Sequence, residues 1–154
     1  MRRLRGRLGG AVTLWTAGSE DAGRAGLTVS SVMVAGGEPG RVLALLDPDA
    51  DLVPVLESTG RGVVHLLQWG ERGLAEAFAG QVPAPGGAFT LGEWEQTAHG
   101  PRLRSAASWA LVELESTTTV GWSDLVVARV VEVVLGADGV ALEHRRGRYL
   151  RAGG

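Results

Sequence analysis

Runs of strand-forming residues are the feature that most limits what this chain can fold into. The clearest runs lie in the last third, where residues 125–135 are a long β-branched stretch and residues 109–114 show partial alternation of apolar and polar side chains. Ala137-Asp138-Gly139 then predicts a hairpin turn, with its partner strand returning over residues 140–149. Four earlier runs have similar character, at residues 12–16, 27–35, 41–46 and 62–67.

Helical patterns are few and short. Asp49 can cap a helix in which Leu52, Val55 and Leu56 follow at helical spacing, and Gly60 should end it. A second helix is predicted over residues 71–78. Strands and helices do not alternate as in a parallel doubly wound sheet. We therefore expect a mainly β (α+β) fold, an antiparallel β-barrel with short covering helices, in one domain spanning residues 1–154.

Two of the predicted segments carry more specific expectations. Residues 41–46 are almost continuously apolar, which predicts a strand that is buried on both faces. Residues 82–87 contain two prolines and two glycines, so no regular structure is expected there.

Composition excludes several classes of function. The formal net charge of -2 gives no reason to expect nucleic acid as a partner. Without cysteine, the chain has no disulfide, thiolate metal site or cysteine nucleophile, and without lysine it has no Schiff-base chemistry. No apolar run reaches the roughly 20 residues of a membrane span. The basic start leads into glycine-rich sequence rather than an apolar signal core, so we expect a cytoplasmic protein whose terminal arginines are solvated.

No nucleotide-binding, metalloprotease or serine-hydrolase motif is present, and the three histidines lack metal-site spacing. His65 lies in an apolar strand, where it either faces a pocket or hydrogen-bonds to backbone. His99 is expected in a loop and His144 on a solvated face. The five tryptophans are spread over different elements, which favours roles as core or interface anchors and predicts a homodimer.

Hydroxyl groups in an otherwise apolar strand are the most informative polar feature. Thr28-Val29-Ser30-Ser31 places three hydroxyls where burial without partners would be costly. These hydroxyls either cross-link to neighbouring strands or bind a polar ligand, and chemistry alone favours neither reading.

Several segments occur in a recognisable order along nearly the whole chain. They are Gly10-Ala11-Val12-Thr13, Gly26-Leu27-Thr28-Val29-Ser30-Ser31, Leu45-Leu46-Asp47, Ser58-Thr59-Gly60, Phe78-Ala79-Gly80, Trp94, Gly100-Pro101-x-Leu103 and Arg146-Gly147-Arg148-Tyr149. In this order they resemble the flavin reductase-like family, the NAD(P)H:flavin oxidoreductase components of two-component monooxygenases.

The resemblance implies an antiparallel Greek-key split β-barrel that forms a homodimer and binds FMN, or takes FAD or riboflavin as substrate, near the subunit interface. NADH or NADPH would supply the hydride directly, so no catalytic side chain and no metal is implied. A flavin-dependent monooxygenase is the implied protein partner. The residues carried over to the flavin site are Thr28, Val29, Ser30, Ser31, Leu46 and Asp47.

The sequence departs from the family at three places. The family's Leu-Asp-x-Ser-x-x-Thr turn for phosphate has Asp49 and Leu52 in place of its hydroxyls, and its asparagine after Phe-x-Val is His65. The family's late Gly-Asp-His is here Gly121-Trp122-Ser123. Two functions therefore remain open: an NAD(P)H:flavin reductase, or a non-catalytic dimeric split-barrel protein that binds a flavin-like ligand weakly or not at all.

Overall fold

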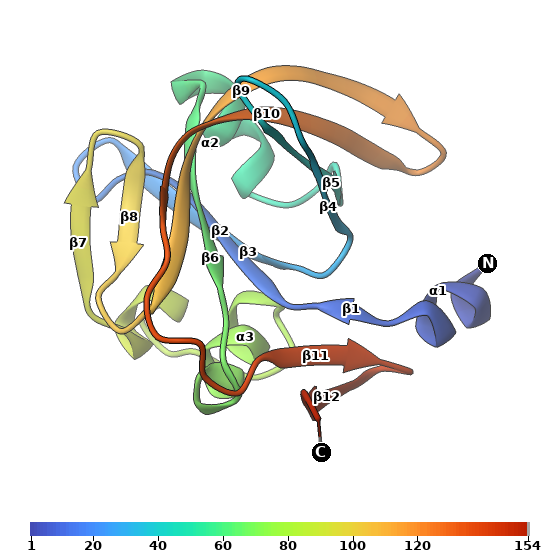
Figure 1. Cartoon of the computed structure of the whole chain (residues 1–154). Coiled ribbons are helices and arrows are strands. Elements are labelled where there is room, and N and C mark those ends of the chain that lie inside the picture. Colours follow the sequence, from blue (N-terminus) through green and yellow to red (C-terminus); the bar gives the residue numbers. More distant parts are fainter. Residues whose placement is uncertain (154) are drawn as a thin grey trace.

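Figure 1 shows the computed structural model of the chain, which describes residues 1–153. The strands are β1 (Gly10–Ala11), β2 (Thr13–Ser19), β3 (Gly23–Val29), β4 (Val32–Ala35), β5 (Arg41–Leu46), β6 (Arg61–Leu66), β7 (Trp94–Thr97), β8 (Gly100–Leu103), β9 (Ser108–Val120), β10 (Ser123–Val134), β11 (Leu142–Arg145) and β12 (Arg148–Arg151). The helices are α1 (Arg2–Leu8), α2 (Leu52–Thr59) and α3 (Arg72–Phe78), with the 3-10 turns η1 (Trp69–Glu71) and η2 (Ala88–Leu91). None of the helices in this part of the chain is long and apolar enough to cross a bilayer.

The main sheet has seven strands in the order β3-β2-β6-β9-β10-β5-β4, and every pair in it is antiparallel. Within this sheet β6, β9 and β10 are consecutive neighbours, and the earlier strand β5 lies beside β10. The connection from β5 to β6 therefore crosses the end of the sheet through α2, which is Greek-key topology. The predicted antiparallel, mainly β fold class is confirmed.

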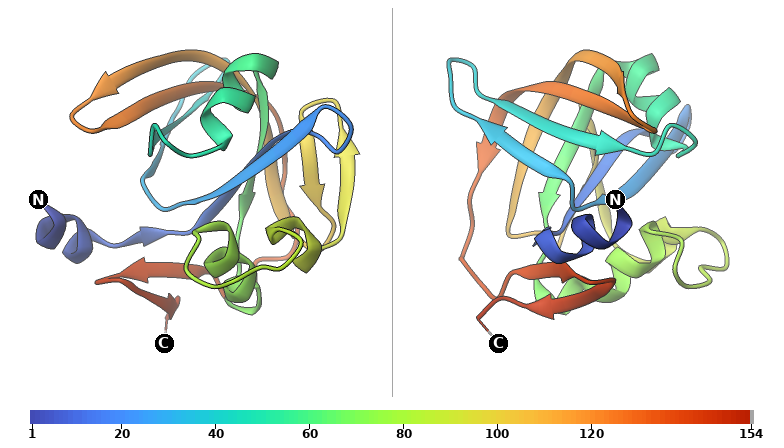
Figure 2. Two further views of the ribbon diagram at one scale, coloured as in Figure 1. Left: turned by 180° about the vertical axis from the view of Figure 1, so that it is seen from behind. Right: turned by 90° about the vertical axis from the view of Figure 1, so that its right-hand side faces the viewer.

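The two edges of this sheet are joined by a very short link. Strands β3 and β4 lie at opposite ends of the order, yet only Ser30 and Ser31 separate them in the sequence. Six interstrand gaps in a flat sheet would span about 29 Å, whereas the step from Val29 to Val32 reaches at most about 11 Å. The sheet must therefore curl until its edges approach each other, as both views in Figure 2 show. We call the link Ser30–Ser31 the seam.

Two hydrophobic clusters lie on opposite faces of β2. Trp15 belongs to the cluster enclosed by the curled sheet, whereas its neighbour Leu14 belongs to a cluster outside it. Helix α2 contributes Leu52 and Leu56 to the inner cluster, and α3 contributes Phe78 to the outer one. Figure 1 shows the two helices near opposite ends of the barrel. Both faces of β2 are therefore covered.

Helix α2 ends where the sequence predicts and begins later than expected. Gly60 adopts the left-handed conformation (φ 68°) and its N–H donates to Leu56 O at 2.8 Å. The helix begins at Leu52, with Asp51 rather than Asp49 at the N-cap. The Asp49 N–H is instead bound by Asp47 Oδ1 at 2.9 Å, because residues 47–50 form a turn of their own.

The predicted hairpin through Ala137-Asp138-Gly139 is wrong. Strand β10 is paired with β9 along the whole of one edge, and residues 124–129 of its other edge are paired with β5, so a partner strand over the full predicted length has no room. The chain therefore leaves the main sheet after Val134, and β11 pairs with β1 and β12. The hairpin that β10 does form turns at Gly121 and Trp122.

Two further strand predictions need correction. Residues 27–35 are not one strand, because the chain crosses the seam between β3 and β4. Strand β5 is not buried on both faces: Val42, Ala44 and Leu46 face the core, whereas Leu45 is 41% exposed. Nothing in residues 1–153 packs over the outer side of Leu45. The predictions for residues 62–67, 71–78 and 82–87 are confirmed within one or two residues.

His65 is a structural residue held between two backbone groups. Its side chain is fully buried, with Nδ1 2.8 Å from Leu14 O and Nε2 2.9 Å from Leu103 N. The carbonyl requires a donor and the N–H an acceptor, so the imidazole is neutral with its proton on Nδ1. Burial, which disfavours the charged form, lowers the pKa of His65 to about 4. Of the two readings, backbone hydrogen bonding is the correct one.

This histidine makes the stability of the fold depend on pH. Its pKa falls from 6.5 in the unfolded chain to about 4 in the folded one, so protons bind preferentially to the unfolded state. We expect the free energy of unfolding to fall by about 3 kcal/mol on this account as the pH is lowered from 7 through 4. Denaturant titration of the wild type and His65→Gln should show a shallower pH dependence for the variant between pH 6.5 and 4.5. Equal slopes would contradict this role, and His99→Gln is the control.

Candidate functional site

The seam lies directly beside the end of β5. The Leu45 N–H donates to Ser31 O at 3.1 Å, and the β4–β5 ladder continues from there with Val32 opposite Ala44. This register brings Ser30 and Ser31 next to Leu46 and Asp47, although the two segments are separated by a strand and a loop in the sequence. The structure thus unites four of the six residues that the resemblance selects.

Ser30 and Ser31 are the polar side chains available at this place. Both residues are exposed, and neither hydroxyl is hydrogen-bonded to any group in residues 1–153. Free hydroxyls on a short, well-anchored link can donate to or accept from a polar ligand. For these two residues the geometry favours the ligand reading of the Thr28–Ser31 hydroxyls.

The remaining predicted residues contribute structure rather than accessible side chains. Thr28 Oγ1 donates to Ala75 O at 2.7 Å, which ties β3 to α3. The side chains of Val29 and Leu46 are 4% and 1% exposed and belong to the inner cluster. Val29 and Leu46 can therefore meet a ligand only through their backbone. The Thr28 hydroxyl is therefore structural, although it links its strand to a helix rather than to a neighbouring strand as expected.

The turn after β5 is acidic. Asp47, Asp49 and Asp51 are exposed, and none of them forms an ion pair within residues 1–153. Leu52, which stands where the family has threonine, is fully buried and faces the core. A phosphate about 4 Å from one such carboxylate would be repelled by about 1 kcal/mol per charge pair in water and about 4 kcal/mol at an effective dielectric of 20. The turn is therefore a poor place for phosphate.

Gly10 lies beside the seam, and the structure explains why this position needs a glycine. A Cβ at residue 10 would lie 2.9 Å from Ser30 O, which is closer than carbon and oxygen tolerate. A glycine is therefore needed for β1 to pass the seam. In the sequence this requirement is visible only as the pair of glycines at residues 9 and 10, which does not indicate which part of the chain passes close to them.

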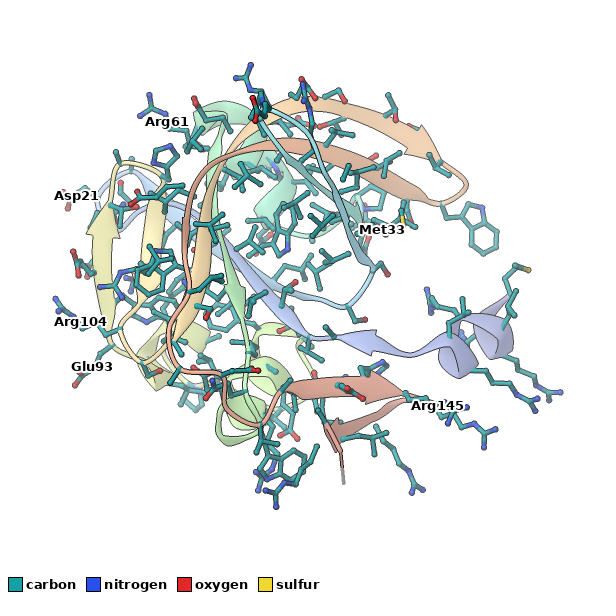
Figure 3. All side chains as sticks on the ribbon, in the orientation of Figure 1. Asp21, Met33, Arg61, Glu93, Arg104 and Arg145 are labelled. Atoms are coloured by element: carbon teal, nitrogen blue, oxygen red, sulfur yellow. The ribbon has the colours of Figure 1, made fainter. Side chains whose placement is uncertain are left out.

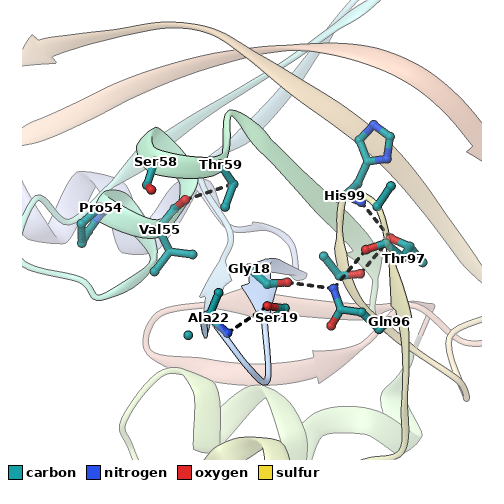
Figure 4. A pocket seen from close by; sticks show the side chains of 13 residues that line it. Gly18, Ser19, Ala22, Pro54, Val55, Ser58, Thr59, Gln96, Thr97 and His99 are labelled. Atoms are coloured by element: carbon teal, nitrogen blue, oxygen red, sulfur yellow. Dashed lines mark hydrogen bonds between the residues drawn. The ribbon is translucent and has the colours of Figure 1, made fainter.

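A hollow of about 470 Å³ lies elsewhere on the molecule, away from the seam. Figure 4 shows it between α2, the β2–β3 hairpin and the β7–β8 hairpin. Gln96 Nε2 donates to Gly18 O at 2.9 Å and Thr97 Oγ1 donates to Gly100 O at 2.8 Å, so much of its polar lining is already satisfied. His99 lies in the turn between β7 and β8, as predicted, and lines this hollow. The lining of this hollow contains none of the six residues predicted for the flavin site. We therefore place the candidate site at the seam.

Comparison with known proteins gives a consistent result. The family described as "Flavin reductase like domain" matches residues 5–153. FMN reductase (NADH) RutF of Variovorax paradoxus is 30% identical over 149 residues, which cover 96% of this chain and 82% of that protein. The reductase component of 4-hydroxyphenylacetate 3-monooxygenase from Thermus thermophilus is 32% identical over 126 residues, covering 82% of this chain and 78% of that protein.

The fold is also found among solved structures. The NADH:FAD oxidoreductase SgcE6 of Streptomyces globisporus, in complex with NAD and FAD fragments, superposes with a TM-score of 0.86 at 20% identity. The superposition covers 97% of this chain and 89% of that one. This likeness shows that the two proteins share a fold.

The different roles of Thr28 and Ser30 can be separated by stability. We expect Thr28→Val to lower the free energy of unfolding by about 1 kcal/mol, because it removes the hydrogen bond from Thr28 to Ala75 O and leaves Ala79 N–H as the remaining donor to that carbonyl. Ser30→Ala should change stability by less than about 0.5 kcal/mol, since its hydroxyl is free. Urea denaturation of both variants measures this difference. A Ser30→Ala variant as destabilised as Thr28→Val would show that the Ser30 hydroxyl is structural.

Proposed function

The chain belongs to the flavin reductase-like family, and we propose that it is an NAD(P)H-dependent flavin reductase whose flavin site is the seam with the adjoining end of β5. The observation that carries this proposal is the juxtaposition of Ser30–Ser31 with Leu46–Asp47, held by the hydrogen bond from Leu45 N–H to Ser31 O. The family match over residues 5–153 supports the proposal independently. We also propose that residues 1–154 form one domain and that the protein is cytoplasmic.

The residues at the seam fit a flavin ring and its polyhydroxyl chain. A bound flavin supplies the hydride-accepting chemistry, so the protein needs no acid, base or nucleophile of its own. Ser30 and Ser31 provide free hydroxyls, and the backbone at Val29 and Leu46 is fixed by the buried side chains of those residues. These groups bind and orient the two reactants, which is the main contribution a protein makes to a direct hydride transfer.

The names of relatives support the choice of cofactors. The Variovorax relative is named an FMN reductase (NADH), and the Streptomyces structure holds NAD and FAD fragments. We propose that this chain likewise uses a flavin, FMN with FAD or riboflavin as alternatives, together with NADH or NADPH. The Thermus relative is the reductase component of a monooxygenase, which makes a flavin-dependent monooxygenase the proposed recipient of the reduced flavin.

An uncovered apolar surface beside the seam supports a homodimer. Met33 on β4 is 66% exposed, and Leu45 on the neighbouring strand β5 faces outward on the same side of the sheet. Trp122, at the tip of the β9–β10 hairpin, is 96% exposed. Figure 1 shows this hairpin extending beyond the rest of the barrel. Exposed aromatic and aliphatic side chains of this kind are typical of subunit interfaces. A second copy placed here would cover the outer face of β5 and enclose the seam.

One observation favours a different function. The acidic turn at residues 47–51 lacks the hydroxyls that the family uses for phosphate. A dimeric split-barrel protein without catalytic activity, binding a flavin-like ligand weakly or not at all, would tolerate such a turn. Flavin-dependent oxidation of a nicotinamide nucleotide separates the two functions.

We expect the purified protein to oxidise NADH or NADPH only when a flavin is added, and Ser30→Leu to abolish this activity. A leucine at residue 30 fills the space above the seam, while the exposed position leaves the melting temperature unchanged. The matched control is Ser58→Leu, an equally exposed serine at the other hollow, which should keep the wild-type rate. Absorbance at 340 nm is the readout. Activity retained in Ser30→Leu but lost in Ser58→Leu would move the site to the other hollow, and a wild type without activity would favour the non-catalytic alternative.

The proposed dimer can be tested at the exposed tryptophan. We expect the wild type to have the mass of a dimer at micromolar concentration, and Trp122→Ser to raise the dimer dissociation constant about 30-fold or more, as for a buried interface anchor. Sedimentation velocity over a concentration series measures both. Val82→Ser, an exposed apolar residue in the loop before η2, is the control and should not change the mass. A monomeric wild type would refute the proposed dimer.

A further inference from the structure

The arginines are distributed very unevenly along the chain. Of the fifteen basic side chains, all of them arginine, four lie between residues 2 and 7 and four between residues 145 and 151. These two segments, which we call the terminal arginine cluster, contain no carboxylate. The rest of the chain keeps seven arginines against all seventeen carboxylates. The two ends are strongly basic while the body is strongly acidic.

The fold brings both ends of the chain to one place. Strand β1 pairs with β11, with Gly10 opposite His144. The Arg146 N–H donates to Gly6 O at 2.8 Å, and Arg145 Nε donates to Arg7 O at 3.3 Å. The cluster is therefore built by tertiary structure, and Figure 3 shows Arg145 next to α1.

The charges of the cluster are not neutralised within the part of the chain that the structure describes. The two ion pairs found there are Arg41–Glu115 and Arg102–Glu95, neither of which involves the cluster. All eight arginines of the cluster are exposed. Uncompensated guanidinium groups held side by side create a positive potential and present several donors that match the geometry of phosphate oxygens.

Strand β1 connects the seam to the terminal arginine cluster. Strand β1 passes so close to the seam that a Cβ on Gly10 would lie 2.9 Å from Ser30 O. From Gly10 the chain runs directly into α1 in one direction and pairs with β11 beside it. A ligand at the seam thus has an acidic turn on the β5 side and the arginines on the β1 side.

We propose that the terminal arginine cluster binds the phosphate groups of a nucleotide whose ring system lies at the seam. The proposal rests on the proposed function and deepens it, because it assigns the phosphate to a place other than the turn after β5. Asp47 and Asp49 repel a phosphate at that turn, whereas guanidinium groups attract it on the opposite side of Ser30. The shared chemistry is a nucleotide phosphate, carried either by the flavin or by the nicotinamide nucleotide.

A small ligand fits the charge distribution better than a large polyanion does. The body of the protein is acidic and would be repelled by a nucleic acid or an anionic membrane extending past the cluster. Helix α1 has only seven residues, too few for a stable amphipathic anchor in a membrane surface. A nucleotide needs only the local field of the cluster.

The test compares two double variants that remove the same charge. Arg145→Gln with Arg148→Gln weakens the cluster, and Arg61→Gln with Arg104→Gln is the control. Figure 3 shows Arg61 and Arg104 on the side of the molecule away from Arg145. Dissociation constants for FMN, FAD and riboflavin are measured by flavin fluorescence at low and high salt, and KM values for NADH and NADPH with riboflavin as acceptor. Melting temperatures check that each variant is folded.

We expect the cluster variant to bind at least one phosphate-bearing nucleotide about tenfold or more weakly, as for two lost charge-assisted contacts, with a reduced salt dependence. Riboflavin should bind as in the wild type. A change for FMN and FAD assigns the cluster to the flavin phosphate, and a change in KM for NADPH or NADH assigns it to the nicotinamide nucleotide. The control variant should match the wild type throughout.

Three results would overturn the proposal. They are unchanged nucleotide binding in the cluster variant, an equal loss for riboflavin, and an equal loss in the control. Unchanged nucleotide binding together with lost sedimentation on phosphatidylglycerol vesicles would identify the cluster as a membrane contact and overturn it as well. In each case the wild-type protein would still reduce riboflavin with NADH, so failure of this proposal is distinguishable from failure of the proposed function.

Discussion

A seven-stranded sheet whose two edge strands are joined by only two residues must curl into a barrel. The link Ser30–Ser31 imposes this closure, and the pairing of β9 with β6 and β10 supplies the continuous ladder that makes closure possible. The inner cluster around Trp15 and helix α2 then fills the enclosed space. Because the link crosses from one edge to the other, its backbone cannot take part in a regular ladder on both sides. The seam is thus the place where the sheet leaves polar groups free, and a ligand site follows from the same constraint that makes the barrel.

The two sides of the seam carry opposite charge. The carboxylates of Asp47 and Asp49 lie on the side of β5, and the arginines of the two chain ends lie on the side of β1. A neutral ring between them meets hydroxyls and fixed backbone, while a charged substituent is directed toward one side only. This arrangement allows a family member to lose the hydroxyls of its phosphate turn and still recognise a nucleotide. The electrostatic field of these carboxylates and arginines, rather than individual hydrogen bonds at the turn, then selects the orientation of the ligand.

The sequence predicted the fold class, the end of α2 at Gly60, and the strand at residues 62–67, because hydrophobic runs and glycine signals are local properties. It did not predict the break at Ser30–Ser31, since no glycine or proline marks it and closure of the sheet is a non-local demand. The false hairpin at residues 137–139 has the same origin: local turn chemistry was right for a hairpin, but β9 already occupied one edge of β10 and β5 occupied residues 124–129 of the other. The two segments that the motif selected for the site lie side by side in the structure, yet the inward orientation of Val29 and Leu46 depended on packing that spacing alone does not reveal. The meeting of the arginine-rich ends depended on β1 pairing with β11, which no local pattern indicated.

The central claim is that flavin binds at the seam rather than in the hollow between α2 and the β7–β8 hairpin. Amide hydrogen exchange of the wild-type protein, with and without saturating FMN, tests this claim most directly. The account predicts slower exchange on binding at residues 30–32 and 45–49, with no change at residues 18–23 and 96–100. Protection confined to residues 18–23 and 96–100 would contradict it.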